Sequence, residues 1–253
     1  MSVFFTESDF KAFEVRKAML EDTKTIADRK IVVEKMRDLH KCGIGNFMKS
    51  KGLNPHWREK TNLTNVIWPL KQANGGSVTY LRLGYGKSKE QIDNLSKYLK
   101  LYSFNDRGYL KDDMAFHYIT QIQIALDESE WNTSLYLGKH GWLEQNNIVN
   151  KIKAENNKNK FIELLDDIID NGYILRLYLE EETIEYKNSK AFINDMTRYT
   201  NDGITYTIHI INSREKLDDN NEIKKIIPFI KSEFGKLLDL YYFMSWSENN
   251  NYI

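Results

Sequence analysis

The sequence is poor in cysteine and proline and contains no long hydrophobic run. Its one cysteine, Cys42, excludes an internal disulfide framework, and no spacing of Cys and His resembles a structural zinc site. No stretch approaches the roughly 18 consecutive apolar residues of a membrane helix, and the N-terminus lacks the features of a signal peptide. We therefore expect a cytoplasmic protein without a membrane segment.

An excess of charge of either sign is also missing. Lys plus Arg and Asp plus Glu each number 36, so no overall field attracts the chain to nucleic acid or to a membrane. Any such partner requires a local patch. Hydrophobic residues make up 41% of the chain, which is enough to bury a core. No linker divides the sequence, so we expect a single domain over residues 1–253.

The clearest strand pattern lies between residues 116 and 137. Large apolar side chains recur at every second position with polar ones between them, as in a strand with one buried face. A four-residue polar break and a second alternating run follow, which predicts an antiparallel hairpin. The inward set is Tyr118, Ile122, Ile124 and Leu126, and the opposite face carries His117, Gln121 and Gln123.

The N-terminal segment, residues 1–50, is predicted to be helical. Thr6 and Asp9 form a start that resembles a capping box, and apolar residues continue beyond them at helical spacing. Gly43 and Gly45 are typical of a helix end.

The C-terminal half alternates helices with strands. A last long helix is predicted over 219–242, with a kink at Pro228 because an interior proline loses a hydrogen bond. The polar tail, 247–251, is expected to fray. This order of elements predicts an α+β fold, in which helices pack on a largely antiparallel sheet. Further helices are predicted over 142–153 and 161–170, and strands over 173–179, 183–186 and 204–210.

Several short motifs resemble, in the same order, a family of small bacterial proteins of unknown function. A Phe-Thr-x-x-Asp-Phe-x-x-Phe helix begins at Phe5, an Arg-Gly-Tyr turn begins at Arg107, and His117 precedes a Gln-Ile-Gln-Ile strand. The resemblance covers roughly the first half of the chain. It implies an α+β sheet protein and no known reaction.

The sharpest catalytic pattern combines Asp170 with Glu185 and Lys187 of a predicted hairpin. Metal-dependent nucleases use two carboxylates to hold Mg²⁺ and a nearby lysine to orient water or offset developing charge. This pattern predicts a metal site at Asp170 and Glu185. The other interpretation is a solvated hairpin edge with cross-strand ion pairs.

A second candidate is a basic and aromatic cluster. Arginine offers bidentate contacts to phosphate and aromatic rings stack on bases, the combination that single-stranded nucleic acid binders use. The alternative is a surface loop anchored by a buried Trp57. The cluster consists of His56, Trp57, Arg58 and Lys60, with Arg82, Lys87 and Arg107 as further members if they lie nearby.

Two smaller patterns complete the candidates. Gly84-Tyr-Gly86-Lys87-Ser88 joins a predicted strand to a helix, so it could cradle an anion or be an ordinary turn. His117 and His209 fall on predicted strands opposite the apolar positions. They could share one sheet face and bind a metal or transfer protons, or they could be hydrogen-bonded fillers.

Two functions follow from these patterns. The first is a binding module without a cofactor, which presents the polar sheet face and the 54–60 loop to an anionic partner such as nucleic acid. The second is a Mg²⁺-dependent nuclease of the restriction or phage-defence type. Whether the protein is an enzyme is left open by the sequence.

Overall fold

The structure is a computed structural model, and its residues cluster into two compact units. Unit 1 comprises Met1–Tyr85, Gln123–Thr133 and Ser213–Phe234, and unit 2 comprises Gly86–Ile122, Ser134–Asn212 and Gly235–Ile253. The structure describes residues 3–17, 22–55, 78–88, 90–92, 94–95, 118–216 and 218–253.

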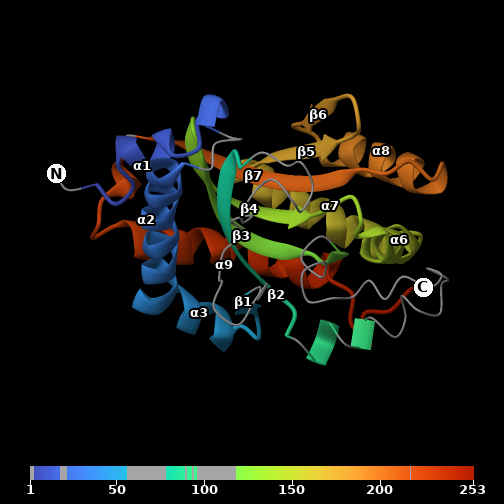
Figure 1. Ribbon diagram of the computed structural model, residues 1–253. Helices are drawn as coiled ribbons and strands as arrows, with labels where there is room; N and C mark the ends of the chain where they lie inside the picture. The colour runs from blue at the N-terminus through green and yellow to red at the C-terminus, as the bar shows by residue number, and fades with distance from the viewer. Residues whose placement is uncertain are drawn as a thin grey trace. The chain divides into compact units, whose positions relative to one another are not determined.

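The described strands form a seven-stranded sheet in the order β1-β2-β3-β4-β7-β5-β6 (Figure 1). Strand β5 pairs antiparallel with both β6 and β7. The predicted α+β class, with a largely antiparallel sheet, is confirmed. The strands are β1 (Asn54–Pro55), β2 (Tyr80–Gly86), β3 (Gln121–Asp127), β4 (Glu130–Leu137), β5 (Ile174–Tyr178), β6 (Thr183–Tyr186) and β7 (Thr207–Glu215).

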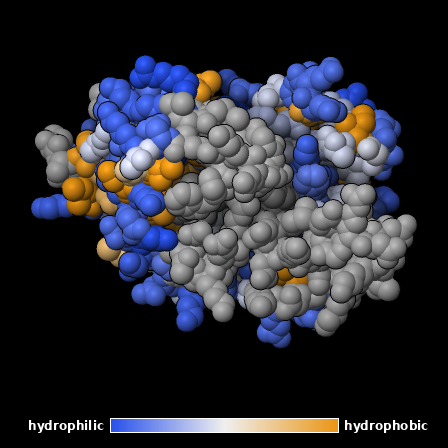
Figure 2. Space-filling view, in the orientation of Figure 1, coloured by the Kyte–Doolittle hydropathy of each residue, from blue (hydrophilic) through white to orange (hydrophobic). Residues whose placement is uncertain are grey.

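Helices precede, interrupt and follow these strands. None of the described helices combines the length and hydrophobicity that a bilayer crossing requires. Hydrophilic residues make up much of the coloured surface in Figure 2. The helices are α1 (Glu7–Lys11), α2 (Thr23–Leu39), α3 (Gly45–Ser50), α6 (Trp142–Lys151), α7 (Glu155–Asp170), α8 (Ser189–Asn201) and α9 (Ile226–Met244), with 3-10 turns at Val15–Lys17 and Asp219–Asn221.

In unit 1, a buried carboxylate fixes α1. Asp9 is 3% exposed, and its Oδ2 accepts hydrogen bonds from the Thr6 backbone N–H at 2.6 Å and from the Thr6 hydroxyl at 2.9 Å. The Lys35 ammonium of α2 contacts the same oxygen at 2.5 Å and donates to the Phe4 carbonyl at 2.8 Å. The predicted helix start is therefore present, and it is joined to α2 by an ion pair.

Within unit 1, the first residues of the chain are hydrogen-bonded to residue 221. The Asn221 side chain accepts from the Phe5 N–H and donates to the Phe5 carbonyl, both at 2.8 Å. The Phe5 ring packs against Trp131, whose ring lies edge-on to Phe229 with centroids 5.6 Å apart. These aromatic contacts place the first residues of the chain inside the core.

The predicted helix end at the glycines is confirmed. Helix α2 ends at Leu39, and after the turn His40–Ile44, in which Gly43 has non-helical φ and ψ, α3 starts at Gly45 across a kink. Gly43 has φ +134°, a value that side chains disfavour, and a Cβ there would lie 2.8 Å from the Lys231 Nζ. At Gly45 a Cβ would lie 2.5 Å from the His40 ring. The glycines therefore allow the chain to kink between α2 and α3 while it passes close to Lys231 and His40.

The predicted hairpin is confirmed as β3 and β4. Ile122, Ile124 and Leu126 are fully buried, as the alternation predicts. The prediction is wrong for Tyr118, which lies before β3 begins at Gln121 and is only half-buried. On the other parity, Gln121 and Gln123 are also buried, at 1% and 3% exposure.

In unit 2, the carboxylate of Glu144 is completely buried and lies at a junction of four chain segments. Its Oε1 accepts from the Lys87 ammonium at 2.5 Å and from the Trp246 N–H at 2.8 Å. Its Oε2 accepts from the Thr120 hydroxyl at 2.7 Å and from the Thr120 N–H. Lys87 also donates to Ser245. These contacts satisfy both carboxylate oxygens, so the buried charge is compensated.

The predicted kink at Pro228 is wrong because the last helix starts later than expected. Helix α9 begins at Ile226, so the proline is the third helical residue. Backbone N–H groups in the first turn have no partner inside the helix, and a proline there removes nothing.

The predicted fraying of the tail is also wrong. The Asn250 side-chain amide donates to the carbonyls of Ser245 at 2.7 Å, Phe243 at 3.2 Å and Tyr242 at 3.3 Å. The ammonium of Lys151 donates to the Phe243 carbonyl at 3.1 Å and to the Asn250 Oδ1 at 2.7 Å, and burial lowers the pKa of Lys151. An amide and a cation thus satisfy the last carbonyls of α9, where the helix dipole favours positive charge.

Glu144→Gln is expected to destabilise the protein by about 3–5 kcal/mol, because it leaves the buried Lys87 charge without its counter-ion. Urea denaturation followed by circular dichroism measures this loss. Glu163→Gln is the matched control, because Glu163 forms an exposed pair with Lys160 at 3.9 Å. Equal losses in the two variants would contradict the role assigned to Glu144.

Asn250→Ala is expected to lower the free energy of unfolding by about 1–2 kcal/mol, because the carbonyls at the end of α9 lose their donors. Asn249→Ala, at an exposed neighbouring position, is expected to leave stability unchanged. Thermal or urea denaturation of both variants checks this. A frayed tail would make the two variants indistinguishable from the parent protein.

Candidate functional site

The parts of β4, β7, β5 and β6 that lie in unit 2 present polar and aromatic side chains on one sheet face. The pairing places Arg176 of β5 opposite His209 of β7 and opposite Glu185 of β6. Residues that are directly opposite in an antiparallel pair point to the same face. Tyr178, two residues beyond Arg176, therefore shares this face as well.

Three rings meet on this face. The His209 imidazole lies between the rings of Tyr136 and Tyr178, with centroid distances of 5.7 Å and 5.8 Å. Its Nδ1 is 3.4 Å from the Tyr178 hydroxyl. All three side chains are half-buried, so each ring retains some accessible surface. We call the set Tyr136, Arg176, Tyr178 and His209 the ring face.

A charged pair borders the rings. The Arg176 Nε donates to the Glu185 Oε1 at 2.7 Å across the β5–β6 pair. Burial alone lowers the pKa of Arg176, but the interactions with Tyr178 and Glu185 outweigh it, so the pKa is raised. The guanidinium therefore stays positive at every ordinary pH.

The opposite face of the same strands is apolar and buried. Leu175 and Leu177 of β5 stand opposite Ile210 and Ile208 of β7, and all four are fully buried. On this side Tyr186, the partner of Leu175, meets Phe192 of α8 edge-on at 5.5 Å. Figure 1 shows α8 beside β5 and β6. The packed rear face holds the strands of the ring face in fixed register.

This arrangement has the parts of a recognition surface. Tyrosine and histidine rings provide flat surfaces on which bases or other rings stack, and a guanidinium can pair with a phosphate. Because the rings come from three adjacent strands, their spacing is fixed by the sheet and does not depend on a loop.

The residues of the predicted magnesium site lie on the surface of unit 2. Asp170 is the exposed last residue of α7, Glu185 forms the ion pair with Arg176, and Lys187 is exposed just after β6. Within the described residues, no group of three or more His, Cys, Asp and Glu side chains is arranged to hold a metal. The Arg176–Glu185 pair matches the hairpin-edge interpretation, and the metal site stays a prediction.

The predicted basic and aromatic cluster lies mostly outside the described residues. Of its possible further members, Arg82 in unit 1 is buried, and its guanidinium is 5.5 Å from the Tyr80 ring centroid. In unit 2, Lys87 is buried and its ammonium donates to Glu144. The predicted binding residues that lie outside the described part of the chain are His56, Trp57, Arg58, Lys60, Arg107 and His117.

Sequence reasoning identified His209 but missed its neighbours. Arg176 and Tyr178 occupy one parity of β5 and Leu175 and Leu177 the other, a signal that was present in the sequence. Tyr136 similarly alternates with buried residues of β4. Which strands lie side by side was not encoded by this alternation.

Comparison with protein-family models gives no match, and comparison with curated proteins gives none either. The resemblance of the N-terminal half to a bacterial family therefore stays a prediction.

Glu185→Gln distinguishes the two interpretations of the hairpin. If Glu185 only pairs with Arg176, the substitution lowers the free energy of unfolding by at most about 1 kcal/mol, as for other exposed cross-strand pairs. Urea denaturation measures this value. Under the nuclease interpretation, the parent protein would cut plasmid DNA in Mg²⁺, and both Glu185→Gln and Asp170→Asn would abolish the cutting.

Proposed function

We propose that this protein is a binding module that takes up single-stranded nucleic acid on the ring face. The observation that carries the proposal is the meeting of Tyr136, Tyr178 and His209 with Arg176 on one half-buried sheet face. Rings of this kind stack on bases of any sequence, and a nearby guanidinium pairs with the phosphate backbone.

The charge distribution supports an anionic partner in a second, separate way. Residues 22–55 of unit 1 contain eight Lys and Arg against four Asp and Glu, a net charge of +4. No acidic residue occurs between Lys41 and Lys51, and the side chains of Lys41 and Lys49 are exposed. A chain with no overall charge therefore carries a local basic segment, which is what binding to phosphates requires.

Magnesium-dependent cleavage remains the alternative function, with Asp170, Glu185 and Lys187 as its residues. The ion pair of Glu185 with Arg176 favours the binding module. A carboxylate that coordinates Mg²⁺ gives its oxygens to the metal, whereas the Glu185 Oε1 accepts a hydrogen bond from Arg176.

Tyr136→Ala and Tyr178→Ala are each expected to weaken binding of a fluorescent single-stranded oligonucleotide by about tenfold, because each loses one stacking surface. Fluorescence anisotropy at low salt measures the affinity. Tyr242→Ala is the matched control, since Tyr242 is an exposed tyrosine of α9 in the same unit. Arg176→Gln is expected to reduce the salt dependence of binding as well as its strength.

An affinity that is the same in the parent protein, the two ring-face variants and the control would overturn the proposal. So would the absence of any saturable binding at low salt. Circular dichroism of each variant confirms that the fold is retained before affinities are compared.

A further inference from the structure

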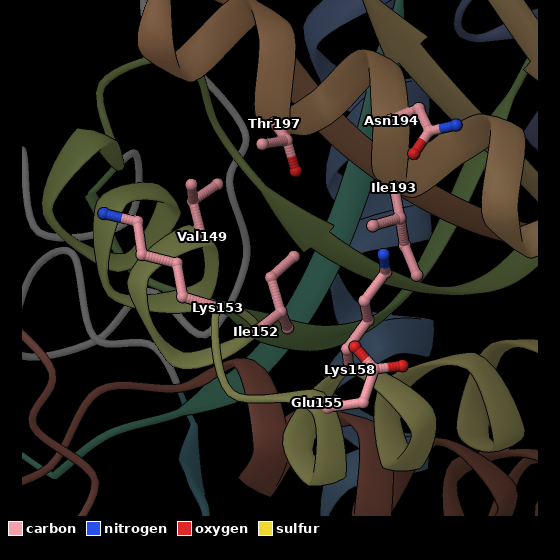
Figure 3. Close-up of a pocket in the computed structure, with 8 residues that line it drawn as sticks. All are labelled: Val149, Ile152, Lys153, Glu155, Lys158, Ile193, Asn194 and Thr197. Carbon is pink, nitrogen blue, oxygen red and sulfur yellow. The ribbon is translucent and has the colours of Figure 1, made fainter.

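A depression of about 310 Å³ lies in unit 2, where the end of α6, the start of α7 and the middle of α8 come together (Figure 3). Its floor is aliphatic. Val149, Ile152 and Ile193 line it and are 3%, 6% and 2% exposed. The side chains of this floor belong to α6, its C-terminal cap and α8, so the surface is shaped by packed elements.

The rim carries one charge of each sign on the first turn of α7. Glu155 and Lys158 are three positions apart, a spacing at which such side chains commonly pair. They do not form an ion pair within 4 Å, and the described residues supply neither with another charged partner. Figure 3 shows the Lys158 ammonium extending toward α8. Both charges therefore remain available to a ligand.

The second lysine of the rim has a different role. The Lys153 ammonium donates to the Asn150 Oδ1 at 2.8 Å, and Figure 3 shows it extending away from α8. Opposite α7, Thr197 and Asn194 of α8 contribute a hydroxyl and an amide to the lining. The rim thus offers one cation, one anion and two hydrogen-bonding groups above an apolar floor.

We propose that this depression binds an aliphatic α-amino acid. The branched side chain of the ligand lies on the floor, its carboxylate faces Lys158 and its ammonium faces Glu155. A simple carboxylate would satisfy Lys158 but would leave Glu155 facing a like charge, and a simple amine would do the reverse. A small zwitterion with an apolar group matches every part of the lining.

The proposal is tested with the full chain and three ligands of the same shape, by isothermal titration calorimetry. L-leucine carries both charges, 4-methylpentanoate lacks the ammonium and 3-methylbutylamine lacks the carboxylate. Leucine is expected to bind with a Kd between about 0.1 and 10 mM, and each analogue about tenfold more weakly because one charged contact is lost.

Substitutions assign the two contacts. Lys158→Gln is expected to remove the preference for leucine over 3-methylbutylamine, and Glu155→Gln the preference over 4-methylpentanoate. Lys160→Gln, an exposed lysine of the same helix paired with Glu163, is the control and keeps both preferences. Equal binding of the three ligands, an equal effect of Lys158→Gln and Lys160→Gln, or no saturable leucine signal would overturn the proposal. The oligonucleotide assay tests a separate surface, so the two proposals fail independently.

Discussion

The buried carboxylate of Glu144 is the constraint on which unit 2 depends. A charge that is fully removed from water must be paired and hydrogen-bonded, and Glu144 meets this requirement with Lys87, Thr120 and Trp246. Each donor comes from a different part of the chain. The end of β2, the approach to β3 and the residues after α9 are therefore positioned by one side chain of α6.

The two faces of the sheet in unit 2 differ in character. Leu175 and Leu177 of β5 pack toward the apolar side, while Arg176 and Tyr178 of the same strand belong to the ring face. The pleat of a strand makes this division possible, because successive side chains point to opposite faces. Substitutions on the ring face therefore leave the packed apolar face, which preserves the register, unchanged.

Local patterns in the sequence predicted most elements, and contacts between distant residues were not predictable. Alternation correctly placed Ile122 and Ile124 in the core, but it predicted a polar face at Gln121 and Gln123, which are buried as well. The partners of Glu144 lie 57 and 102 residues away at Lys87 and Trp246, so no local pattern connects them. The ring face could not be predicted for the same reason. It requires β7 to lie between β4 and β5, and this strand order is set by packing. The polar tail looked unstructured, although Asn250 finds its acceptors only once α9 is formed.

The discontinuous make-up of both units affects how the chain folds during synthesis. The hydrogen bonds between Phe5 and Asn221 span 216 residues, and the Glu144 carboxylate is not satisfied until Trp246 is present. Neither core can be completed while the ribosome still holds the last third of the chain, since N-terminal segments fold first only when their partners have emerged. The burial of Phe5 therefore waits until the segment around Asn221 and Phe229 has been synthesised.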